Sequence, residues 1–99
     1  MSGYIIANYT ITDPEKYAEY QPAVGPSLAQ YGGKLIVAST EAKVIEGNPH
    51  STTVVVEFES VEAAQRAYDS PEYTKIKHLR TSSTEGWLII VPQFVMPQG

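Results

Sequence analysis

The sequence contains no cysteine. Disulfide bonds, thiolate metal sites and a cysteine nucleophile are therefore excluded, although this absence assigns no compartment. Histidine is scarce as well: His50 and His78 are far apart, and neither stands in HExxH or another ligand spacing. The GxSxG elbow, the P-loop and the GxGxxG fingerprint are also missing, so we expect neither a metal nor a cofactor.

Positive charge is in short supply too. Seven Lys and Arg residues face eleven Asp and Glu residues, which gives a formal net charge of −4. Nucleic-acid binding needs a basic patch, so this balance argues against a nucleic-acid partner and, more weakly, against an anionic membrane surface. A strand-like pattern begins at Tyr4, without a basic leader or a long apolar run. We therefore expect a cytoplasmic protein with no membrane partner.

Apolar residues are abundant, at 42% of the chain. The length predicts one domain, residues 1–99. Val54-Val55-Val56 precedes Glu57-Phe58, and residues 87–91 read Trp-Leu-Ile-Ile-Val without a polar break. Such runs are typical of strands buried on both faces. The predicted helices can cover only one face of a small sheet, so we expect the other face to pack on a second copy, as a homodimer. Both faces are apolar, which leaves open the face that meets the partner.

Local signals predict the order of the elements. Strands are expected at residues 4–11, 34–40, 52–59 and 87–95, with 41–46 as a possible continuation of the second. Asp13 and Pro14 begin a first helix, which ends at Gly32-Gly33. Two prolines inside this helix predict a kink or two abutting pieces.

A second helical zone follows the third strand. Ser60 caps its first helix, and Ser70 with Pro71 begins a separate short helix that runs to about Thr81. The predicted order is β-α-β-β-α-β. This is an α+β, ferredoxin-like arrangement, an antiparallel sheet with its helices on one side.

Tyrosines provide the first candidate ligand site. Tyr17, Tyr20 and Tyr31 lie on one side of the first predicted helix, and Tyr68 and Tyr73 come from the second zone. A buried tyrosine needs a partner for its hydroxyl. These phenols either line a polar-tipped cavity for a small ligand or are ordinary core residues.

Arg80 is the second candidate. Tyr73, Ile76 and Leu79 define the inward side of the last predicted helix, and Arg80 falls within the same sector. A buried guanidinium requires an anion or other acceptors. Its partner is either Glu57, the one charge within the third strand's apolar run, or the carboxylate of a substrate. Asn8, a polar amide in the middle of a strand, either orients a substrate or marks the rim of the sheet.

Several segments together resemble the domain-of-unknown-function family DUF 1330. They are Asp13-Pro14-Glu15-Lys16-Tyr17, Tyr31-Gly32-Gly33-Lys34, Glu46-Gly47, Val56-Glu57-Phe58-Glu59-Ser60, and Tyr68-Asp69-Ser70-Pro71-Glu72-Tyr73 followed by Arg80. The resemblance implies a dimeric α/β-barrel, in which two ferredoxin-like sheets pack face to face. The wider superfamily includes cofactor-free monooxygenases, isomerases of small aromatic or lactone substrates, and ligand-sensing domains. Their pockets lie between sheet and helices, and the family itself has no agreed activity.

Three functional hypotheses follow. The first is a cofactor-free enzyme that acts on a small anionic or aromatic substrate. In it Tyr17, Tyr31, Tyr73 and Asn8 place polar groups, Arg80 binds an anionic oxygen, and Glu57 is the candidate general base if burial raises its pKa. The second is a non-catalytic module that binds a metabolite. The third is a purely structural homodimer whose interior is filled by its own side chains.

Overall fold

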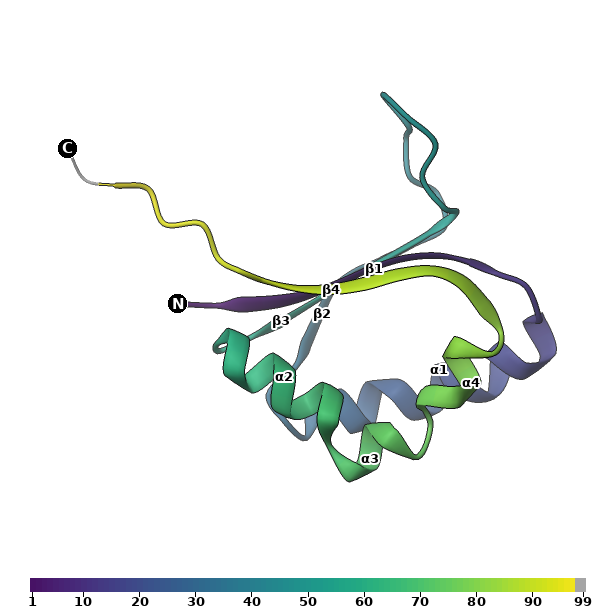
Figure 1. The fold of residues 1–99 in the computed structure, drawn as a ribbon, viewed down its shortest axis with the longest axis horizontal. Coiled ribbons are helices and arrows are strands. Elements are labelled where there is room, and N and C mark those ends of the chain that lie inside the picture. The colour runs from purple at the N-terminus through teal and green to yellow at the C-terminus, as the bar shows by residue number, and fades with distance from the viewer. Residues whose placement is uncertain (98–99) are drawn as a thin grey trace.

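The computed structural model describes residues 1–97 and consists of one antiparallel sheet with all its helices on one face (Figure 1). The elements are β1 (Gly3–Ile11), α1 (Pro14–Ala29), β2 (Lys34–Ser39), β3 (Thr52–Phe58), α2 (Val61–Asp69), α3 (Pro71–Thr74), α4 (Lys77–Thr81) and β4 (Thr84–Pro92). The strand order is β2-β3-β1-β4, and every neighbouring pair is antiparallel. The predicted ferredoxin-like fold is confirmed.

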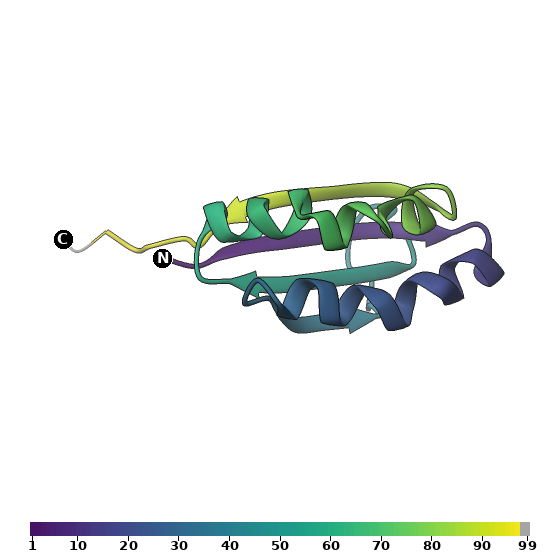
Figure 2. The ribbon, with the colours of Figure 1, turned by 90° about the horizontal axis from the view of Figure 1, so that it is seen from below.

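The helices form one layer against the sheet. Figure 2 is seen from the helix side. It shows α1 in front of β2 and β3, and α2, α3 and α4 in front of β1 and β4. Side chains alternate between the faces of a strand. Ile5 and Val56 are paired across β1 and β3, and both are buried on the helix side, where they pack with Phe58 and the alanines of α2.

The opposite side of the sheet, here called the open face, is not covered by any element of the described chain (Figure 1). Ile6 pairs with Val55 on one side and with Ile89 on the other, which places an apolar row across its centre. Ile89 and Trp87 are 44% and 47% exposed. The strands are therefore apolar on both faces, as predicted, and the face away from the helices is the uncovered one.

The helix-start signals act as predicted. The side chain of Asp13 accepts a hydrogen bond from the backbone N–H of Lys16, and those of Ser60 and Ser70 accept from Ala63 and Tyr73. Each cap satisfies a backbone donor that has no partner within the helix. Within residues 1–97, no helix combines the length and the apolar character that a membrane crossing requires.

Two helical segments differ from the prediction in their continuity. The first helix is one continuous element despite Pro22 and Pro26, so the alternative of two abutting pieces is wrong, and the kink stays a prediction. Each proline removes only one backbone donor, and the buried side chains of α1 hold the turns in place. The segment 71–81, predicted as one helix, is split into α3 and α4. Ile76 and Leu79 donate to carbonyls three residues back, which tightens the backbone at the break.

Two strand boundaries also differ from the prediction. The last strand begins at Thr84 and ends at Pro92, because residues 84–86 pair with β1 up to its last residue. Residues 41–46 form no strand: they belong to a loop that projects from the sheet on the side away from the helices (Figure 1). Gly47 turns this loop with φ of 82°.

Candidate functional site

A cavity of about 230 Å³ lies between the sheet and the helix layer. Its wall is mostly aliphatic and includes Ile5, Val54, Val56 and Leu88 from three strands. Five tyrosines add aromatic rings and hydroxyls to this wall: Tyr9, Tyr17, Tyr20, Tyr68 and Tyr73. Tyrosine rings thus line a cavity, and they are core residues at the same time.

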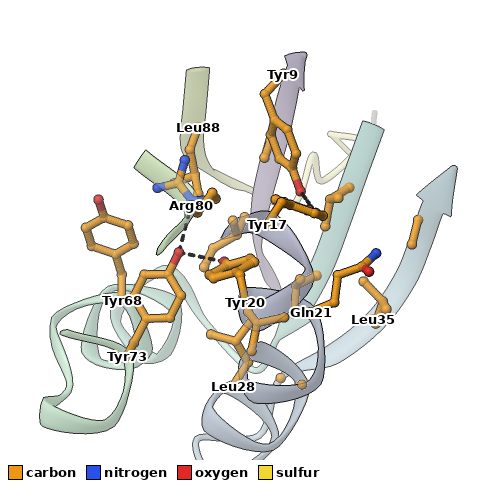
Figure 3. A pocket seen from close by; sticks show the side chains of 18 residues that line it. Tyr9, Tyr17, Tyr20, Gln21, Leu28, Leu35, Tyr68, Tyr73, Arg80 and Leu88 are labelled. Carbon is orange, nitrogen blue, oxygen red and sulfur yellow. Dashed lines mark hydrogen bonds between the residues drawn. The ribbon is translucent and has the colours of Figure 1, made fainter. Parts of the chain in front are cut away.

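Four of the five tyrosine hydroxyls form two hydrogen-bonded pairs (Figure 3). Tyr9 and Tyr17 share a short hydrogen bond, and the oxygens of Tyr20 and Tyr73 lie 2.8 Å apart. Arg80 Nε donates to the hydroxyl of Tyr73 at 3.1 Å. Arg80, Tyr73 and Tyr20 therefore form one hydrogen-bonded chain across the cavity wall.

Two of these phenols stay protonated at neutral pH. Burial is the main cause that raises the pKa of Tyr9 well above its usual value, and the hydrogen bond to Tyr17 adds to it. Burial also raises the pKa of Tyr20, with further contributions from Tyr73. Both hydroxyls can therefore donate hydrogen bonds, and neither is suited to act as a base.

Arg80 brings a positive charge to the cavity. Its side chain is 8% exposed, and it is the one charged residue among the described residues that line the cavity. Burial opposes its charge, but the neighbouring phenols, with Tyr73 first, outweigh burial and raise the pKa of Arg80. Across residues 1–97, Arg80 forms no hydrogen bond or ion pair with a carboxylate, and only its Nε is hydrogen-bonded to another side chain.

Of the two partners predicted for Arg80, Glu57 is wrong. Glu57 follows Val56, whose side chain points to the helices, so the alternation of the strand turns Glu57 to the open face. There it accepts a hydrogen bond from the Tyr4 hydroxyl at 3.2 Å and is paired in register with Lys34. Glu57 does not line the cavity and is not placed to act as a base in it.

Asn8 also lies outside the cavity. Its amide nitrogen donates to the carbonyls of His50 and Thr52 and to the Thr53 hydroxyl, and its oxygen accepts from the backbone N–H of His50. The His50 ring is in turn hydrogen-bonded to the Thr10 hydroxyl at 2.9 Å. Asn8 thus anchors the loop between β2 and β3.

Tyr31 has a structural contact as well. Its hydroxyl donates to Glu72 at 2.6 Å, which ties the segment after α1 to α3. Of the predicted site residues, the structure brings together Tyr17, Tyr73 and Arg80, and it separates Asn8, Tyr31 and Glu57 from them.

Sequence reasoning missed several residues of the cavity. Tyr9 follows Ile5 and Ala7 on one side of β1, so alternation alone would have placed it with the inward set. Leu35 and Gly25 carried no such signal, because their position depends on how α1 crosses the sheet. Within the described part of the chain, no three His, Asp or Glu side chains gather in a way that would hold a metal ion.

The family model of a domain of unknown function, DUF1330, matches residues 2–94. The chain belongs to the DUF1330 family. This confirms the resemblance seen in the sequence. No curated protein matches the chain significantly.

Solved structures share the fold. A protein of unknown function from Rhodopseudomonas palustris, RPA0582, has 17% sequence identity and a TM-score of 0.77, with 96% of this chain and 84% of that chain covered. SnoaB, a cofactor-independent oxygenase from Streptomyces nogalater, has 11% identity and a TM-score of 0.66, with 99% and 95% covered. A conserved protein from Methanosarcina mazei Go1 has 17% identity and a TM-score of 0.59, with 95% and 94% covered. The likeness to these three structures shows that this DUF1330 protein shares their fold.

Proposed function

We propose that this DUF1330 protein binds a small, largely apolar organic anion in the cavity beneath α1, and that it does so as a homodimer. The buried guanidinium of Arg80 carries this proposal. A buried charge is stable only when it is paired or hydrogen-bonded on most sides. Tyr73 accepts a hydrogen bond from Nε only. The two Nη groups are therefore left to bind a ligand.

The chemistry of the wall defines the ligand. Arginine presents a planar pair of donors that matches a carboxylate, and charge-assisted bonds of this kind are the strong ones. The aliphatic and aromatic wall suits an apolar body, which can stack on the tyrosine rings. A cavity of about 230 Å³ is small, because drug-sized ligands occupy pockets of roughly 300–1,000 Å³. A compact aromatic or aliphatic carboxylate fits these features.

A cofactor-free enzyme is the second candidate. Arg80 and the protonated phenols would stabilise negative charge that develops on a substrate oxygen. The fold is also that of SnoaB, a cofactor-independent oxygenase. However, no carboxylate or imidazole is found among the described residues that line the cavity. Such a reaction would therefore need a substrate that is acidic enough to ionise without a protein base, which favours binding as the first proposal.

The homodimer would form through the open face, because its central apolar row has no cover within the protomer. This arrangement leaves the cavity, on the other side of the sheet, free for a ligand. A purely structural dimer is the weaker hypothesis, since the space beneath the tyrosines is not filled by side chains. The cytoplasmic location stays a prediction.

Benzoate and its neutral analogue benzamide test the proposal. We expect benzoate to bind the wild-type protein and benzamide to bind much more weakly. Replacing Arg80 with methionine should reduce benzoate affinity roughly 10- to 100-fold, as expected for a charge-assisted hydrogen bond of about 1.5–3 kcal/mol. Isothermal titration calorimetry measures these affinities.

The matched control is Arg66→Met, which removes an exposed arginine of α2 and should leave benzoate affinity unchanged. Circular dichroism shows whether Arg80→Met is folded, and Arg80→Lys retains the charge if methionine is not tolerated. Equal binding of benzoate and benzamide, or wild-type affinity in folded Arg80→Met, would contradict the proposal.

A further inference from the structure

The exposed residues that line the cavity come from two neighbouring elements, α1 and β2. Most of the side chains that line it are buried or half-buried, whereas its four exposed lining residues are Gln21 and Gly25 of α1 and Leu35 and Ala38 of β2. Leu35 is 61% exposed although it belongs to this wall. In Figure 3, Gln21 and Leu35 lie on one side of the cavity, and Tyr73 and Arg80 lie on the other. The opening is therefore between α1 and the edge strand β2, and the charge is at the closed end.

Gly25 is anomalous for its place in the fold. It lies inside α1, where glycine destabilises a helix relative to alanine because its backbone loses more conformational freedom on folding. Packing does not require it: apart from its two neighbours in the chain and the adjacent helix backbone, no atom of the described residues lies within 4 Å of the position that a Cβ would take. Its backbone does not require it either, since it is not among the glycines with positive φ.

The following proline does not explain Gly25. A residue before proline is hindered in the helical region through its Cβ, and Gly25 precedes Pro26. The same helix, however, contains Gln21 directly before Pro22, and α1 continues through both positions. A residue with a side chain is therefore accepted before proline in this helix.

We infer that Gly25 and Leu35 form the entrance through which the ligand reaches Arg80, and that the missing side chain of Gly25 keeps this entrance open. This inference rests on the proposed binding of an organic anion. It orients the ligand: the anionic group enters first and reaches Arg80 and Tyr73, and the apolar end remains near Leu35. The residue at position 25 thus limits the width of the ligands that the cavity accepts.

The absence of cysteine makes a reversible test possible. Gly25→Cys is labelled with benzyl methanethiosulfonate, which attaches a benzyl group through a disulfide that dithiothreitol removes. The control is Ala18→Cys, labelled in the same way. Ala18 is exposed on the same side of α1, two turns or about 10 Å away, and does not line the cavity. Benzoate association is followed by stopped-flow fluorescence.

We expect the labelled Gly25→Cys protein to bind benzoate at least tenfold more slowly than the unlabelled variant, and dithiothreitol to restore the rate. The labelled Ala18→Cys protein should bind at the unlabelled rate. Leu35→Cys, on the other side of the entrance, is a second variant that should be slowed by the same label.

The outcomes separate this inference from the proposed function. If labelled Gly25→Cys and Leu35→Cys bind benzoate as fast as the unlabelled proteins, the entrance is elsewhere, although the cavity still binds the anion. If the wild-type protein does not bind benzoate at all, the proposed function fails and the entrance fails with it. A slow rate in labelled Ala18→Cys equal to that of labelled Gly25→Cys would also overturn the inference, because the effect would not be specific to the opening.

Discussion

The buried phenols of Tyr9 and Tyr20 make the stability of the protein depend on pH. Burial raises the pKa of both phenols above the value near 10 that they have in an unfolded chain. The folded protein therefore keeps these protons at a pH at which the unfolded chain begins to lose them. Their contribution is fully present below pH 10 and is lost as the pH rises through their folded-state pKa, because the unfolded state then binds fewer protons.

We expect the free energy of unfolding to fall between pH 8 and pH 11, by up to about 1.4 kcal/mol per pH unit above 10 for each of these two phenols. Tyr9→Phe and Tyr20→Phe should each show a smaller fall, since each removes one titrating group. Urea unfolding at the two pH values measures the difference. An identical fall in the wild-type protein and in both variants would show that these phenols do not carry the alkaline sensitivity.

The sequence placed some of these residues correctly for a physical reason and misplaced others. The inward position of Arg80 was predicted from the spacing of Tyr73, Ile76 and Leu79. The Arg80 side chain is buried as predicted, although the helix is broken at Ile76. Glu57, one of the two partners predicted for Arg80, was chosen for its charge, and the structure turns it to the open face beside the inward Val56. Opposite charge was weaker evidence for this contact, because it does not say to which face of the strand a side chain points.

Ser70 joins two helices and thereby positions the closed end of the cavity. It ends α2, where its hydroxyl donates to the Ala67 carbonyl, and it begins α3, where the same oxygen accepts from the backbone N–H of Tyr73. Tyr73 in turn holds Arg80. The geometry of the anion site therefore depends on one buried hydroxyl between two elements.

Ser70→Ala should lower the free energy of unfolding by about 1–2 kcal/mol and weaken benzoate binding several-fold, because Tyr73 and Arg80 lose their fixed position. Ser60→Ala is the matched control: it removes the cap at the other end of α2, away from the cavity, and should lose stability without losing affinity. Thermal unfolding and calorimetry measure the two effects. If both variants bind benzoate equally well, Ser70 only caps the helices and does not position the anion site.

Element boundaries were predictable where they depend on local hydrogen bonds. The starts at Asp13, Ser60 and Ser70 were correct because a cap involves only a few neighbouring residues. The start of β4 could not be predicted in this way, because residues 84–86 become a strand only by pairing with β1, which is far away in the sequence. The opening of the cavity was unpredictable for the same reason, since it depends on how α1 crosses β2.

The whole molecule combines a cavity on one side of its sheet with an apolar face on the other. The sequence predicted this excess of apolar surface, and the structure assigns it to the face that carries Ile6, Val55 and Ile89. A loop with exposed Val44 and Ile45 projects on the same side (Figure 1). A second copy packed there would remove the apolar row from water.

Ile89→Glu tests the proposed dimer. Ile89 is half-exposed in the protomer, so a glutamate there is compatible with the single subunit, but an unpaired charge in the apolar row that the interface would bury costs several kcal/mol. We expect the wild-type protein to sediment as a dimer at micromolar concentration and the variant to dissociate roughly 100-fold more readily or to precipitate. Ile45→Glu, a charge on the projecting loop instead of the sheet, should leave the row at the centre of the interface intact and change the equilibrium far less. A compact wild-type monomer at that concentration would mean that the open face is tolerated in water, and the homodimer proposal would then be wrong.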